Sequence, residues 1–69
     1  MKISARNILK GTVVEVTKGA TTAHVKIDIG GGATVTASIT DASVDDLGPA
    51  PGKTAHAVIK ASDVMVAVD

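Results

Sequence analysis

An alternating pattern on both sides of three consecutive glycines most constrains how this 69-residue chain can fold. Apolar residues alternate with His, Lys and Asp over residues 23–29, and with Thr and Ser over residues 33–39. A period of two is that of a β-strand with one buried face. Glycine reaches positive φ without steric cost, so residues 30–32 are predicted to form a hairpin turn between two antiparallel strands.

Three further strands are expected, over residues 8–18, 53–61 and 64–68. In the first of these the apolar side chains change face between Val13 and Val14. A strand that changes face partway usually bends or carries a bulge, as strands do at the corners of barrels. The last segment alternates Val with Met and Ala, which again predicts a strand.

The segment 41–47 interrupts the β pattern and predicts one short helix. Thr40 or Asp41 can cap its amino end, Gly48 can end it, and two prolines follow. Five strands with a short helix between the third and the fourth favour an all-β fold with small α content. We therefore expect a five-stranded OB-like Greek-key barrel that forms a single domain over residues 1–69.

The composition predicts that this domain assembles with copies of itself. A core of this size supplies roughly 3–5 kcal/mol, and small domains usually add disulfides, metals or oligomerisation. The chain has no cysteine and no aromatic residue, so its core must be built from Val, Ile and Ala. The missing burial is expected between subunits of a homo-oligomer.

Charge and hydropathy exclude two classes of partner. Seven basic and seven acidic residues give zero net charge, whereas nucleic-acid binders show a basic patch and single-strand binders use aromatic stacking. No apolar run approaches the roughly 20 residues that span a bilayer, and the first residues lack the pattern of a signal peptide. We expect a cytoplasmic protein that binds neither nucleic acid nor membrane.

Catalytic and metal-binding patterns are absent from the sequence. His24 and His56 are the only histidines, and each falls on the polar side of an expected strand without a nearby carboxylate pattern. There is no cysteine nucleophile, and no serine stands in a nucleophile elbow. The glycines join strand to strand, so they do not form a phosphate loop. We expect no enzymatic activity, no resident metal and no cofactor.

Two short segments at opposite ends of the chain resemble each other and predict an oxyanion site. Ser4-Ala5-Arg6 and Lys60-Ala61-Ser62 each place one cation beside a hydroxyl and a small side chain. A tetrahedral dianion requires about two cations and several neutral donors. Thr40 and Ser43 add hydroxyls at the helix start, where backbone N–H groups also favour anions. These residues alone leave open that the cations are ordinary solvated side chains and the hydroxyls simple caps.

The motifs SARNILKG, TDASVDDLG, PG and IKASDVMV, in this order, resemble those of the molbindin family. Molbindins are single-domain Mop or TOBE-type molybdate-binding modules, and the resemblance extends from Lys2 to Val68. It implies a hexamer, built as a trimer of dimers, that binds molybdate or tungstate at subunit interfaces. Further sites near three-fold axes, lined largely by backbone amides, are implied but cannot be placed on this sequence.

The resemblance also implies which residues bind the oxyanion between dimer partners: Ser4, Arg6, Thr40, Ser43, Lys60, Ala61 and Ser62. The expected function is storage and homeostasis of molybdate or tungstate in the cytoplasm. The alternative is a structural, assembly or sensor-type TOBE domain with no storage role. An OB-type nucleic-acid binder is disfavoured by the missing aromatic residues and basic groove.

Overall fold

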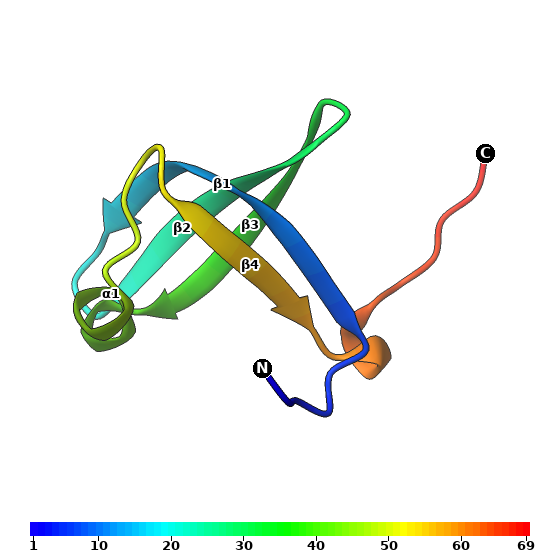
Figure 1. Ribbon diagram of the computed structural model, residues 1–69, viewed down its shortest axis with the longest axis horizontal. Coiled ribbons are helices and arrows are strands. Elements are labelled where there is room, and N and C mark those ends of the chain that lie inside the picture. The colour runs from blue at the N-terminus through cyan, green and yellow to red at the C-terminus, as the bar shows by residue number, and fades with distance from the viewer.

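Four antiparallel strands form one curved sheet in the computed structural model, which describes all of residues 1–69. The strand order is β3-β2-β1-β4, so β3 and β4 form the two edges. In chain order the elements are β1 (Asn7–Lys18), β2 (Thr22–Gly30), β3 (Ala33–Thr40), α1 (Asp41–Leu47), β4 (Thr54–Ile59) and the 3₁₀ turn η1 (Ala61–Asp63). The sheet curls on itself, with α1 and η1 at opposite ends of β1 (Figure 1). The fold is mostly β with one short α-helix, as the sequence predicts.

The central hairpin is confirmed. Strands β2 and β3 pair antiparallel, with Val25 opposite Ala37 and Ile27 opposite Val35. The turn between them contains glycine at positive φ, as the alternation and the three glycines require. The inward face of β2 is almost completely buried, and its outward face is exposed.

The predicted change of face in β1 is also confirmed. The register with β2 shifts between Val13 and Glu15, so Val14 has no partner in that ladder. Val13 is 1% exposed and Val14 is 48% exposed. The bulge bends β1, whose first half pairs with β4 and whose second half pairs with β2.

Gly11 allows β1 and β2 to lie unusually close just before this bulge. A Cβ at Gly11 would lie 2.3 Å from the carbonyl oxygen of Asp28 and 2.7 Å from Cγ2 of Ile27. No side chain fits there, because the nearest obstacle is backbone that cannot rotate away.

The short helix begins and ends where the sequence predicts. Thr40 is its N-cap and accepts a hydrogen bond from the backbone N–H of Ser43. Gly48 adopts the left-handed conformation at φ 64°, and its N–H donates to the carbonyl of Val44. Val44 is buried against the sheet and holds α1 in place. Neither α1 nor η1 is long and apolar enough to cross a membrane.

The buried core of one chain is small. Val13 is its largest fully buried residue. The six buried residues are all apolar: Val13, Ala23, Val25, Ile27, Val44 and Ala57. Several large apolar side chains remain exposed, most of all Met65, Val66 and Val68 in the C-terminal segment, which are about nine-tenths exposed. A core of this extent agrees with the thin core expected from composition.

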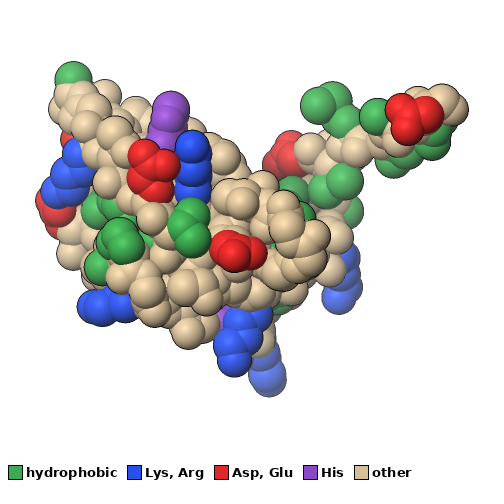
Figure 2. Space-filling view, turned by 90° about the horizontal axis from the view of Figure 1, so that it is seen from above, with side chains coloured by type: hydrophobic (Ala, Val, Ile, Leu, Met, Phe, Trp, Pro, Cys, Tyr) green, Lys and Arg blue, Asp and Glu red, His purple; other side chains and the backbone are tan.

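The predicted fifth strand is not formed, so the sheet has four strands and not five. Residues 64–69 have no regular structure and leave the body of the molecule as an arm that carries apolar side chains (Figures 1 and 2). The fourth strand is also shorter than the expected 53–61, since Ala61–Asp63 turns into η1. The physical reason is that alternation makes a segment suitable for a strand, but a strand also requires an edge to pair with. In one chain the sheet edges β3 and β4 stay open.

Candidate functional site

The two similar segments at the ends of the chain lie next to each other. Asn7 at the start of β1 pairs with Ile59 at the end of β4, and Asn7 Nδ2 donates to the carbonyl oxygen of Ile59 at 3.2 Å. Residues 4–6 come directly before this pair, and residues 60–62 directly after it. The β1–β4 ladder therefore brings together segments that are more than fifty residues apart in the chain.

Neither Arg6 nor Lys60 is paired with a carboxylate. The two ion pairs of the molecule join other residues, Lys18 to Asp45 and Lys26 to Glu15. Both cations are exposed at this end of the sheet, together with the hydroxyls that accompany them in the two segments. Two unpaired cations beside neutral donors can form charge-assisted hydrogen bonds with a dianion. No ion pair within the chain has to be broken for this.

The small residues of the two end segments keep the backbone there accessible. Ala5 is half-buried, while Ala61 and Ser62 are exposed in η1. Lys60 is the N-cap of η1, with extended backbone and no side-chain cap hydrogen bond. Its side chain therefore does not cap the start of this turn.

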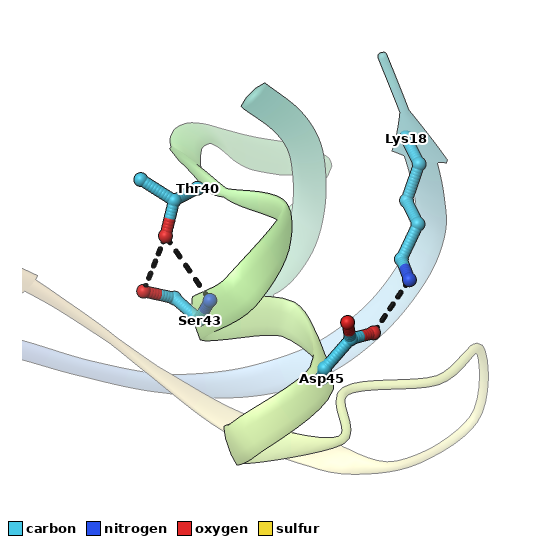
Figure 3. Close-up of polar contacts among 4 residues, drawn as sticks. All are labelled: Lys18, Thr40, Ser43 and Asp45. Carbon is cyan, nitrogen blue, oxygen red and sulfur yellow. Dashed lines mark hydrogen bonds and ion pairs between the residues drawn. The ribbon is translucent and has the colours of Figure 1, made fainter. Parts of the chain in front are cut away.

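The other two predicted residues lie at the start of α1 (Figure 3). The hydroxyl oxygens of Thr40 and Ser43 are 2.8 Å apart, and the Ser43 N–H donates to Thr40 Oγ1 at 3.1 Å. Thr40 is therefore the cap of α1, and the Ser43 hydroxyl lies beside it. Asp41, which follows the cap, has a buried carboxylate oxygen, Oδ1, without a hydrogen-bond partner.

An ion pair fixes the helix to the end of β1. Lys18 Nζ lies 2.5 Å from Asp45 Oδ1, and both side chains are drawn in Figure 3. The hydrogen bond from Asp45 and then its negative charge raise the pKa of Lys18 above its ordinary value. Lys18, at the end of β1, is thus engaged with a carboxylate of α1. Sequence reasoning did not identify this pair, because its members are separated by the whole β2–β3 hairpin.

One chain does not bring all seven predicted residues together. Thr40 pairs with Thr22, just after the far end of β1, whereas Arg6 precedes the near end. A strand of 12 residues spans roughly 35–40 Å when straight, and the bend of β1 shortens this only in part. Figure 1 shows α1 and η1 at opposite ends of that strand. The first cluster, at the η1 end, contains five of the predicted residues: Ser4, Arg6, Lys60, Ala61 and Ser62. The second cluster, at the α1 end, contains Thr40 and Ser43.

The histidines lie apart from each other and on exposed faces. His24 is opposite Ser38 in the β2–β3 ladder, and His56 is opposite Lys10 in the β1–β4 ladder. Neither makes a side-chain hydrogen bond to a carboxylate. No group of three or more His, Asp or Glu side chains is arranged to hold a metal ion. The arrangement that the chain does offer is a set of donors for an anion.

The chain is similar to known proteins over nearly its whole length. The family model of the TOBE domain matches residues 3–66. The probable molybdenum-pterin-binding protein of Haemophilus influenzae is 51% identical over 69 residues, which is all of both chains. A molybdate-binding protein from Sporomusa ovata has a similar structure, with a TM-score of 0.91 and 41% identity over 99% of this chain and all of that one. The cytoplasmic molybdate-binding protein ModG aligns with a TM-score of 0.89 and 46% identity, over 94% of this chain and 46% of ModG.

Proposed function

The chain belongs to the TOBE domain family, and from this premise we propose that it binds molybdate, or the similar tungstate ion, without catalysing a reaction. The observation that carries the proposal is the meeting of Arg6 and Lys60 at one end of the sheet, with neither cation paired to a carboxylate. The names of the relatives, which are molybdenum-pterin-binding and molybdate-binding proteins, support the same ligand.

A site of this kind selects its anion by size and protonation. Arginine, lysine and hydroxyl groups supply hydrogen-bond donors. None of the five residues of the first cluster carries a carboxylate that could accept a hydrogen bond from a protonated ligand. Molybdate carries no proton at neutral pH, whereas phosphate does, and molybdate is larger than sulfate. A rigid set of donors therefore favours molybdate over both.

We place the complete site between two copies of the chain. Within one copy the first and second clusters lie at opposite ends of β1, so the hydroxyls of Thr40 and Ser43 do not reach the anion held by Arg6. A second copy brings its α1 end to the first cluster. The small core and the exposed apolar side chains support assembly, and a hexamer built as a trimer of dimers is the proposed form.

The proposed role is storage and buffering of the oxyanion in the cytoplasm by a single TOBE-type domain. Bound anions neutralise cations that would otherwise repel each other, so anion binding stabilises the assembly by mass action. The description of ModG as a cytoplasmic protein supports this location. The alternative is a domain that assembles but has no storage role.

Calorimetric titration of the anion-free protein with molybdate, sulfate and phosphate tests the ligand. Arg6→Ala and Lys60→Ala are each expected to weaken molybdate binding about 10- to 150-fold, because each removes a charge-assisted hydrogen bond worth about 1.5–3 kcal/mol. Lys10→Ala is the matched control: it removes one exposed, unpaired cation from β1 away from the first cluster.

Equal affinity for the three anions, or equal losses in Lys10→Ala and Arg6→Ala, would show that binding is only a response to net charge. In that case the alternative of an assembly domain would replace the storage proposal. Unchanged secondary structure by circular dichroism is required of each variant before its affinity is interpreted.

A further inference from the structure

One side-chain hydrogen bond joins the two end segments of the chain beside the first cluster. Asn7 Nδ2 donates to the carbonyl oxygen of Ile59 at 3.2 Å, across 52 positions of the sequence. Asn7 directly follows Arg6, and Ile59 directly precedes Lys60. The half-buried Asn7 therefore ties together the two backbone positions that adjoin the unpaired cations of the cluster.

No other hydrogen bond holds the two segments to each other beyond the strands. The β1–β4 ladder ends at the pair of Asn7 and Ile59. The backbone hydrogen bonds of residues 60–64 stay within η1 and its end. No side-chain hydrogen bond or ion pair joins residues 1–6 to residues 60–69. The contact of Asn7 with Ile59 is therefore the last connection between the strands before the candidate site.

Electrostatic repulsion acts against this arrangement when no anion is bound. Arg6 and Lys60 carry like charges, and neither has a carboxylate partner that would neutralise it. Such charges repel each other, most strongly at low ionic strength. Residues 1–6 have no regular structure that would resist their separation from β4. Without the connection at Asn7, the two cations are free to move apart.

We propose that Asn7 is a positioning residue of the oxyanion site, whose hydrogen bond to Ile59 holds Arg6 and Lys60 at a fixed spacing before the anion binds. This inference rests on the proposed function. Donors that are already in place lose less conformational entropy on binding, so the affinity rises. A fixed spacing also favours an anion of one size, because a mobile pair of cations adapts to anions of several sizes.

A neutral amide suits this position better than other side chains. It donates to the Ile59 carbonyl without bringing a charge next to the site. A carboxylate in its place has no proton to donate, and it would attract Arg6 or Lys60 in competition with the anion. An apolar side chain of the same size would leave the carbonyl without this donor. The replacement of Asn7 by Leu therefore removes the hydrogen bond alone.

The anion-free wild-type protein gives the first test. Asn7 is the only asparagine, and the chain has no glutamine, so one pair of side-chain amide signals is expected in the NMR spectrum. These protons are expected to exchange with solvent more slowly than those of a free asparagine, because the group is half-buried and hydrogen-bonded. Exchange at the rate of free asparagine would overturn the inference, and this measurement needs neither a ligand nor a variant.

Calorimetric titration of Asn7→Leu gives the second test. Its molybdate affinity is expected to be about 3- to 10-fold weaker than that of the wild type, as loss of one neutral hydrogen bond predicts. The ratio of molybdate affinity to sulfate affinity is expected to fall as well. Ala57→Gly is the matched control, because it weakens the same β1–β4 ladder and keeps the Asn7 donor. Its affinity and selectivity are expected to equal those of the wild type.

A double-mutant cycle separates positioning from a general loss of stability. Since Asn7 acts on the spacing of two cations, Asn7→Leu is expected to weaken binding less in the Lys60→Ala background than in the wild type. Equal losses in the two backgrounds, equal losses in Asn7→Leu and Ala57→Gly, or wild-type affinity in Asn7→Leu would each overturn the inference and leave the proposed function intact. Absence of molybdate binding by the wild type would instead overturn the proposed function.

Discussion

Substitution of the two neighbouring valines of the β1 bulge tests whether the small core stabilises the fold. Val13 is 1% exposed and Val14 is 48% exposed, although the residues are identical and adjacent. Truncation of valine to alanine removes two methyl groups, which is about 1.6 kcal/mol of transfer free energy when the side chain is fully buried. The cavity left in the core adds to this, so Val13→Ala is expected to lower the free energy of unfolding by about 2–3 kcal/mol.

Val14→Ala is the matched control. About half of its side chain is already in water and little cavity forms, so the expected loss is below about 1 kcal/mol. Against a core that supplies roughly 3–5 kcal/mol, the first variant is expected to be near the limit of folding and the second is not.

Urea unfolding followed by far-UV circular dichroism measures both losses, since the chain has no aromatic residue for fluorescence. The protein concentration is held fixed and anions are removed, because assembly and ligand binding both add apparent stability. Equal losses of unfolding free energy in the two variants, or a loss below about 1 kcal/mol for Val13→Ala, would contradict the placement of Val13 inside the core and of Val14 outside it.

Three further predictions concern other positions. Gly11→Ala is expected to prevent a stable fold, because its Cβ would lie 2.3 Å from the backbone of β2; an unchanged melting temperature would contradict this close approach. Thr40→Ala is expected to lower the free energy of unfolding by about 1 kcal/mol through loss of the helix cap, whereas Thr40→Ser keeps the acceptor; equal losses in urea unfolding would count against the cap. The raised pKa of Lys18 means that the pair with Asp45 stabilises the fold fully below pH 10.5, the ordinary value, and less as the pH rises through the raised pKa. The difference in melting temperature between wild type and Asp45→Asn is therefore expected to stay constant from pH 7 to about 10 and to shrink above it; shrinkage near neutral pH would contradict the assignment.

The elements that the sequence predicts correctly are those fixed by local patterns. The β2–β3 hairpin follows from alternation on both sides of glycine, and the bulge follows from the change of face between Val13 and Val14. The helix follows from a cap at Thr40 and a left-handed glycine at its end. In each case the residues that form the pattern lie within a few positions of the element that they predict.

The fifth strand could not be predicted in the same way. Alternation over residues 64–68 describes the faces of a strand but does not say which edge it joins. In one chain no edge receives it, and the sheet remains open.

The arrangement of the candidate site residues was also predictable only in part. The likeness of the segments around Arg6 and Lys60 indicated that they belong together, and the β1–β4 ladder places them side by side. The separation of Thr40 from them depends on the length and direction of β1 and on the register of two further strands, which no short motif encodes.

A mixing experiment tests most directly the claim that two copies share the anion. Arg6→Ala and Thr40→Ala are each expected to bind molybdate weakly, since each damages a different cluster. When the two variants are unfolded and refolded together, every mixed pair contains one site with both substitutions and one site with neither. Calorimetric titration is then expected to find wild-type affinity in about a quarter of all sites. Recovery of no tight site from the mixture would contradict the account, because it would place the anion within a single copy.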